Sequence, residues 1–253
     1  MGPDHIIQRL RALRDPRMRA LLLVEAFGEG EADSWVEAIT TIMTRAHSAG
    51  DVDAIETLET ITHAAAEPTL AYATRKRLYE AALVQQHPAI ARLFLSVSPT
   101  VLIPATLKKQ LGPERPLRPT DRPLTLGERK SLARTNRRDQ IILLVRDPHP
   151  AVVEILLSNP HVTEADIIKM AAMRPAVPHS LAKIASHPRW SVRHAVKRAL
   201  VLNPATPLAD AIRIATTLKA AELNELAADQ SLPEQLRQHA AEVLSNVALR
   251  PRA

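Results

Sequence analysis

The second half of the chain contains an internal repeat, and this repeat limits the possible folds more than any other feature. The segments that open at Asp147 and His187 both read as a Pro-led apolar helix, an Asn-Pro corner and a second helix containing Ala-Asp. They begin about 40 residues apart, and the second copy is longer by about one helical turn, which keeps its apolar face in register. Helix pairs repeating at this spacing are typical of α-solenoids. The sequence therefore predicts an all-α fold, an α-solenoid of antiparallel helix pairs.

The composition agrees with closely packed helices. The 253 residues are 46% hydrophobic but only 2% aromatic, so Ala and Leu must fill the core in place of large rings. The 20 Pro residues lie between periodic segments, where they start and end helices. The chain has no Cys, which excludes disulfides, thiolate metal ligands and Cys nucleophiles.

The pattern divides the chain into three segments. Residues 1–111 read as degenerate helical repeats or a cap. Residues 112–126 contain four Pro and show no periodicity, which predicts a Pro-rich linker or loop. Residues 127–253 read as helical repeats that end in a capping helix. Thr125 and Glu128 have the spacing of a capping box, so a helix is expected to restart at this point.

The positive charge of the chain lies in its middle. Residues 104–209 hold 18 Lys or Arg and 8 Asp or Glu, a net charge of +10, whereas residues 1–103 and 210–253 carry −3 and −1. A localised basic block attracts anionic groups locally, whereas a uniform basic coat would attract them everywhere.

The stretch 159–204, with its Asn-Pro corners, Pro-opened helices and Val192-Arg193 pair, resembles α-helical repeat proteins of the HEAT-like and leucine-rich-variant kind. The resemblance extends over about 147–245. It implies an α-solenoid fold and a binding surface, but no particular chemistry. The leucine-rich-variant family includes a Cys-bound iron–sulfur cluster, which this chain without Cys does not retain, so no cofactor is predicted.

A basic helix predicted from Trp190 onward is the first candidate site. Five residues form its expected buried stripe: Val192, Ala195, Val196, Ala199 and Leu200. Another part of its surface carries four cations: Arg189, Arg193, Lys197 and Arg198. No Asp or Glu occurs from 167 to 209. The cations are therefore a candidate site for an anionic partner; the alternative is a solvated basic face that is neutralised by acids of a neighbouring repeat.

A second basic cluster follows the Pro-rich segment. Its members are Arg129, Lys130, Arg134, Arg137 and Arg138. Two interpretations remain open: an arm that gains order on an acidic partner, or a solubilising linker.

Neither metal binding nor catalysis is indicated by the motifs. The five His residues between 149 and 194 lack the H-x₃-H spacing of a zinc site, so no metal is expected. His187 and Asp147 share one repeat position, which indicates a corner or capping role. Asp166 and Asp210 also occupy equivalent positions and are interpreted as structural. Trp190 is interpreted as a packing wedge between repeats.

Three classes of function follow. We expect a non-catalytic scaffold that binds a protein partner, acidic in character, through the basic surface. The alternative is a nucleic-acid-binding α-solenoid that contacts phosphates through residues 104–209. The third is a HEAT-like DNA glycosylase, although six aromatic residues scarcely suffice to line a base-binding cleft. With no membrane-length apolar run and no signal-peptide pattern, we expect a cytoplasmic protein.

Overall fold

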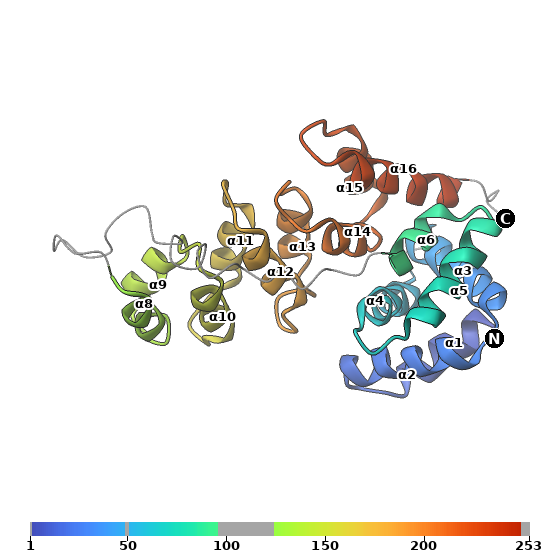
Figure 1. Cartoon of the computed structure of the whole chain (residues 1–253), viewed down its shortest axis with the longest axis horizontal. Helices are drawn as coiled ribbons and strands as arrows, with labels where there is room; N and C mark the ends of the chain where they lie inside the picture. The colour runs from blue at the N-terminus through green and yellow to red at the C-terminus, as the bar shows by residue number, and fades with distance from the viewer. Residues whose placement is uncertain (1, 49–50, 96–123, 249–253) are drawn as a thin grey trace. The chain divides into compact units, whose positions relative to one another are not determined.

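A computed structural model describes residues 2–48, 51–95 and 124–248. These residues form fifteen α-helices and no strand, which confirms the predicted all-α class (Figure 1). Their contacts define two compact units: residues 2–48, 51–95 and 208–248 form the terminal unit, and residues 124–207 form the central unit. All but the last three residues of the predicted linker, 112–126, lie outside the described residues.

Short corners join neighbouring helices within each unit. The terminal unit contains α1 (Pro3–Arg11), α2 (Pro16–Glu29), α3 (Ala32–Ser48), α4 (Val52–Ala66), α5 (Tyr72–Val84), α6 (Pro88–Leu95), α14 (Leu208–Ala215), α15 (Ala220–Ala228) and α16 (Glu234–Ala248). The central unit contains α8 (Leu126–Leu132), α9 (Arg138–Leu144), α10 (Pro150–Ser158), α11 (Glu164–Ala172), α12 (Pro178–Ser186) and α13 (His194–Val201).

In the terminal unit, the last helices of the chain pack against the first ones. α14 contacts α4 and α6, and α16 contacts α3 and α6. Phe27 lies in this core, with its ring centroid 4.7 Å from that of Trp35 and 5.7 Å from that of Phe94, both edge to face. Residues 208–248, which the sequence grouped with 127–207, thus complete a core that the first six helices begin.

His239 of α16 is fully buried in the terminal unit. Its Nε2 lies 2.8 Å from the Thr216 hydroxyl, which itself donates a hydrogen bond to the carbonyl of Ile212. Because that hydroxyl proton is already used, Nε2 is the donor to Thr216. Burial and the nearby charge of Arg92 lower the pKa of His239 to about 3.

We expect the protein to lose stability as the pH falls below about 6.5. The unfolded chain protonates His239 near pH 6.5, whereas the folded chain keeps it neutral down to about pH 3, so this stabilisation is complete above 6.5 and declines below it. At pH 5 the loss is about 2 kcal/mol. Urea unfolding at pH 7 and pH 5 measures it. The variant His239→Gln should lose less stability between these pH values than the wild type, and an equal loss would contradict the prediction.

The helices of the central unit share one burial register. Each of α10 to α13 buries its third, fourth, seventh and eighth residues, and the fourth residue is also buried in α8 and α9. This spacing places the buried side chains on one stripe of each helix. The position of a residue in its helix therefore decides whether its side chain enters the core.

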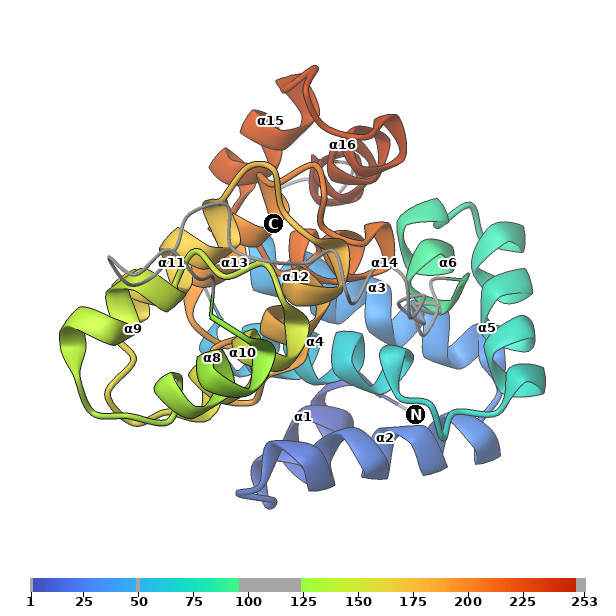
Figure 2. The same cartoon turned by 60° about the vertical axis from the view of Figure 1, so that its left-hand side comes forward.

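Figures 1 and 2 show α9, α11 and α13 in one row and α8, α10 and α12 in the other.

Asparagine side chains join successive corners of the central unit. Asn159, which follows α10, donates from Nδ2 to two carbonyls after α8, at 2.8 and 2.9 Å. Asn203, which follows α13, donates in the same way to two carbonyls at the end of α11, at 2.7 and 3.0 Å. The Asn-Pro corners recognised in the sequence thus have one shared role, which is to fasten each helix end to the helix two places earlier.

The spacing of the packed helices differs from the predicted repeat. α10 packs against α12, and α11 packs against α13, so each of these two pairs joins helices that are two places apart in the chain. The two segments that the sequence pattern matched, opening at Asp147 and His187, lead instead into α10 and α13, which are three places apart. The starts of α10 at Pro150 and of α12 at Pro178 are therefore closer in the chain than the predicted period of about 40 residues.

Candidate anion-binding surface

Arg129 belongs to the core and not to the predicted basic surface. It is the fourth residue of α8, a buried register position, and its side chain is 5% exposed. Its Nη1 lies 2.8 Å from both carboxylate oxygens of Asp147, whose side chain is 1% exposed. Asp147 also accepts a hydrogen bond from the backbone of His149 at 2.9 Å. Arg129 is thus a structural partner of a corner aspartate, and the prediction that it contacts a partner is wrong.

Lys197 is also removed from the surface. α13 begins at His194 and not at Trp190, so Lys197 becomes its fourth residue and is buried beside Val196. The same shift exposes Val192, which is 50% exposed and precedes the helix. The predicted stripe is therefore correct at its Val196 and Leu200 positions and wrong at Val192 and Ala195.

Arg138 is exposed, but its guanidinium forms an ion pair with a carboxylate of the same unit. Its two terminal nitrogens bind the carboxylate of Asp166 at 2.5 and 2.8 Å. Asp166 also closes a capping box with Thr163 at the start of α11. Burial alone would raise the pKa of Asp166, but the hydrogen bonds from Arg138 and Thr163 outweigh it and lower this pKa to about 2. Asp166 is structural, as predicted.

The remaining predicted cations lie on two corners of one edge. Arg134 and Arg137 lie after α8, and Arg189 and Arg193 lie after α12; all four are exposed. The corner after α10 lies between them, because Asn159 binds carbonyls after α8 and the corner after α12 reaches the end of α10 through Trp190. We call Arg134, Arg137, Arg189 and Arg193 the basic edge. The structure thus places cations from the two predicted clusters along the same edge, with the corner after α10 between them.

Of the four cations of the basic edge, acidic side chains of the central unit neutralise only Arg137. Residues 124–207 contain six Asp or Glu and thirteen Lys or Arg. Five of the six acids are held by other groups of the unit: Glu128 by the capping box with Thr125, Asp139 by Arg137, Asp147 by Arg129, Glu154 by Lys183 and Asp166 by Arg138. Arg134, Arg189 and Arg193 form no ion pair with any described residue.

Two other predicted residues lie beside this edge. Lys130 is half-buried, and its carbonyl accepts a hydrogen bond from Arg134 at 3.1 Å. Arg198, in α13, is exposed. Three further cations that the sequence pattern did not indicate are also exposed: Arg146, Lys169 and Arg174. The start of α11 predicts the exposure of Lys169, because Lys169 is the sixth residue of this helix and sixth residues lie outside the buried stripe.

Trp190 packs inside the unit, as expected of a wedge between helices. It is 2% exposed, and its Nε1 donates to the carbonyl of Leu157 at 2.8 Å. Arg189 lies over the indole at 4.3 Å from its centroid, a cation–π contact that fixes the guanidinium near the corner. His187 accepts a hydrogen bond from the backbone of Arg189 at 3.3 Å, which confirms its corner role.

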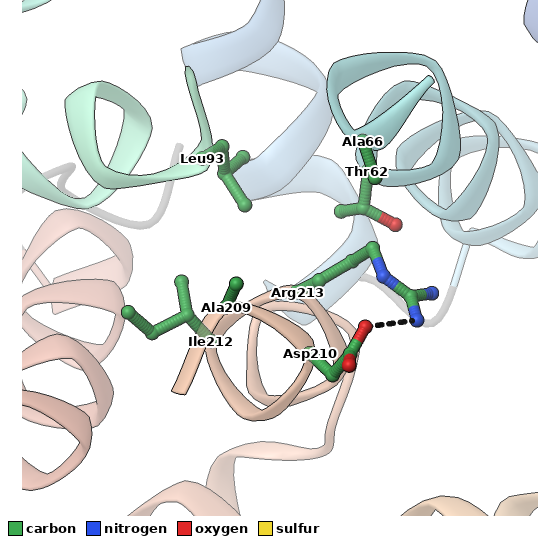
Figure 3. A pocket seen from close by; sticks show the side chains of 7 residues that line it. All are labelled: Thr62, Ala66, Leu93, Ala209, Asp210, Ile212 and Arg213. Carbon is green, nitrogen blue, oxygen red and sulfur yellow. Dashed lines mark hydrogen bonds and ion pairs between the residues drawn. The ribbon is translucent and has the colours of Figure 1, made fainter. Parts of the chain in front are cut away.

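A small pocket lies in the terminal unit between α4, α6 and α14 (Figure 3). Its cavity volume is about 10 Å³, room for no more than a water molecule. Its two charged side chains, Asp210 and Arg213, pair with each other at 3.3 Å. The polar groups of the pocket therefore satisfy each other, and we do not assign it a ligand.

No group of three or more His, Asp or Glu residues suited to a metal ion occurs in the described ranges. Within those same ranges no helix has both the length and the apolar character of a membrane span. Comparison of the chain with protein-family models, curated proteins and solved structures found no match.

Proposed function

We propose that the chain is a non-catalytic scaffold, an α-solenoid of the HEAT-like kind, which binds an acidic protein through the basic edge. Two features support the repeat architecture: the asparagine bonds between successive corners, and the common burial register of α10 to α13. Arrays of this kind stack their repeats into extended surfaces that bind partners.

The observation that carries the proposal is the imbalance of charge at the surface of the central unit. Most of its Asp and Glu side chains are held in buried or local pairs. Arg134 stays exposed after α8, and Arg189 and Arg193 stay exposed after α12. Arginine suits this role because its planar guanidinium binds carboxylates through two parallel hydrogen bonds. An acidic segment that crosses the three corners would meet these cations without competing with internal carboxylates.

Reversing two charges of the basic edge is expected to abolish most of this binding. The double variant Arg189→Glu/Arg193→Glu should bind a Glu-rich synthetic peptide at least about tenfold more weakly than the wild type, because attraction becomes repulsion. Its melting temperature should change little, since both side chains are exposed. Fluorescence anisotropy and thermal unfolding measure the two quantities.

The matched control is Arg11→Glu/Lys76→Glu in the terminal unit. It changes the net charge by the same amount at residues whose side chains are 66% and 57% exposed. Binding that weakens equally in both double variants would show a general charge effect and would contradict a site at the basic edge.

A nucleic acid is the alternative partner, because exposed arginines also bind phosphates. One observation limits this alternative: the single aromatic residue of the central unit, Trp190, is buried and cannot stack on a base. Contacts would then be confined to the phosphate backbone. A steep loss of mixed-sequence DNA binding with rising salt, with no binding of the acidic peptide, would favour this alternative.

A further inference from the structure

The outer faces of α9, α11 and α13 carry side chains that the basic edge does not explain. In each of these helices the fifth and sixth residues lie outside the buried register. In α9 these positions hold Ile142 and Leu143, which are 52% and 47% exposed. The sixth position of α11 holds Lys169, and the fifth position of α13 holds Arg198, both exposed. Large aliphatic side chains thus share one row of helices with cations.

Ile142 and Leu143 are adjacent large aliphatic side chains, and their exposure to water is unfavourable in free energy. Burying either one in a complex would be favourable in proportion to the apolar area removed from water. Aliphatic surface rimmed by polar groups is typical of protein interaction sites. In this row the rim is cationic, since Arg146 follows α9 and is exposed like Lys169.

The acids near this row do not neutralise it. Asp139 pairs with Arg137 at 3.1 Å, and Asp166 is buried against Arg138. Arg146 and Lys169 form no ion pair with any described residue. Arg146 and Lys169 therefore place unpaired positive charge beside the exposed aliphatic pair, which complements a ligand that is apolar and acidic at once.

We infer that the acidic partner of the proposed function docks as an amphipathic helix, with its aliphatic side chains on Ile142 and Leu143 and its carboxylates on Arg146 and Lys169. This inference rests on the proposed function and specifies its partner. A second copy of the chain fits less well, because pairing this face with itself would bring like charges together. A nucleic acid would use the cations and leave the aliphatic pair in water.

The test uses three probes: a synthetic helical peptide with Leu on one face and Glu on the other, the same peptide with Leu replaced by Ser, and a mixed-sequence DNA duplex. The variant Ile142→Ser/Leu143→Ser should bind the first peptide about tenfold more weakly than the wild type, because two apolar contacts are lost. The variant Arg146→Ser/Lys169→Ser should also bind it more weakly, with a smaller dependence on salt. Wild-type protein should prefer the Leu peptide to the Ser peptide.

A matched control for the aliphatic pair is Leu83→Ser/Val84→Ser in the terminal unit. These two consecutive residues end α5 and are 47% and 80% exposed. The control should bind the Leu peptide like the wild type, and an equal weakening would overturn the assigned surface. The comparison of the two peptides on the wild-type protein does not depend on any variant folding.

The outcomes separate this inference from the proposed function. If the Ser peptide binds as tightly as the Leu peptide, and Ile142→Ser/Leu143→Ser has no effect, the amphipathic docking is wrong. The proposed function nevertheless survives if Arg189→Glu/Arg193→Glu still weakens binding. If DNA binds and neither peptide does, both the inference and the proposed acidic-protein partner are overturned.

Discussion

Replacing Asp147 with Ala is expected to lower the free energy of unfolding by about 3–5 kcal/mol, because it leaves the guanidinium of Arg129 buried without a countercharge. The two side chains are 5% and 1% exposed, and the carboxylate holds Arg129 through both of its oxygens. The same carboxylate accepts a hydrogen bond from the backbone of His149, so the corner before α10 loses its support as well. Chemical denaturation measures the loss.

Two comparisons identify the cause of that loss. Asp139→Ala removes an exposed partner of Arg137, with both side chains more than 60% exposed, and should cost less than about 1 kcal/mol. The double variant Arg129→Met/Asp147→Ala removes both buried charges and should recover most of the stability. If the double variant is no more stable than Asp147→Ala, the corner and not the buried charge is responsible.

The class of the fold was predictable because its signals are local. Pro at the start of α10 and α12, and the capping box of Thr125 and Glu128, fix helix starts through the backbone of a few neighbouring residues. Asn-Pro marks corners for the same reason. The packing of residues 208–248 against the first six helices was not predictable, since it depends on contacts between segments far apart in the chain.

The candidate site was predicted in part, and the errors at Lys197, Val192 and Ala195 trace to a helix start. His187-Pro188 resembles a start, but Trp190 is drawn into the core by its bond to Leu157, so the corner takes up the residues as far as 193. The helix then begins at His194 and not at Trp190, which exchanges buried and exposed positions. The exposure of Arg189 and Arg193 does not depend on this shift, because both precede the helix.

The second variant with a large expected effect is Leu200→Asp, which tests the register of α13. Leu200 is the seventh residue of α13 and has no exposed surface. Its replacement removes a packed side chain and introduces a carboxylate that has no water, so the expected loss is about 4 kcal/mol or more. α13 packs against α11 and α12. The loss of helical circular dichroism should therefore exceed that of one helix, since α11 and α12 lose a packing partner as well.

Val192→Asp is the decisive companion variant, because the sequence pattern and the structure make opposite predictions for it. The pattern places Val192 on the same buried stripe as Leu200 and predicts a comparable loss. The structure leaves Val192 50% exposed beside Arg193, so the new carboxylate stays hydrated near a cation and stability should change by less than about 0.5 kcal/mol. Melting temperatures of the two variants decide between these outcomes. A large loss for Val192→Asp would mean that the helix begins near Trp190, which would place Lys197 back on the surface and Val192 in the core.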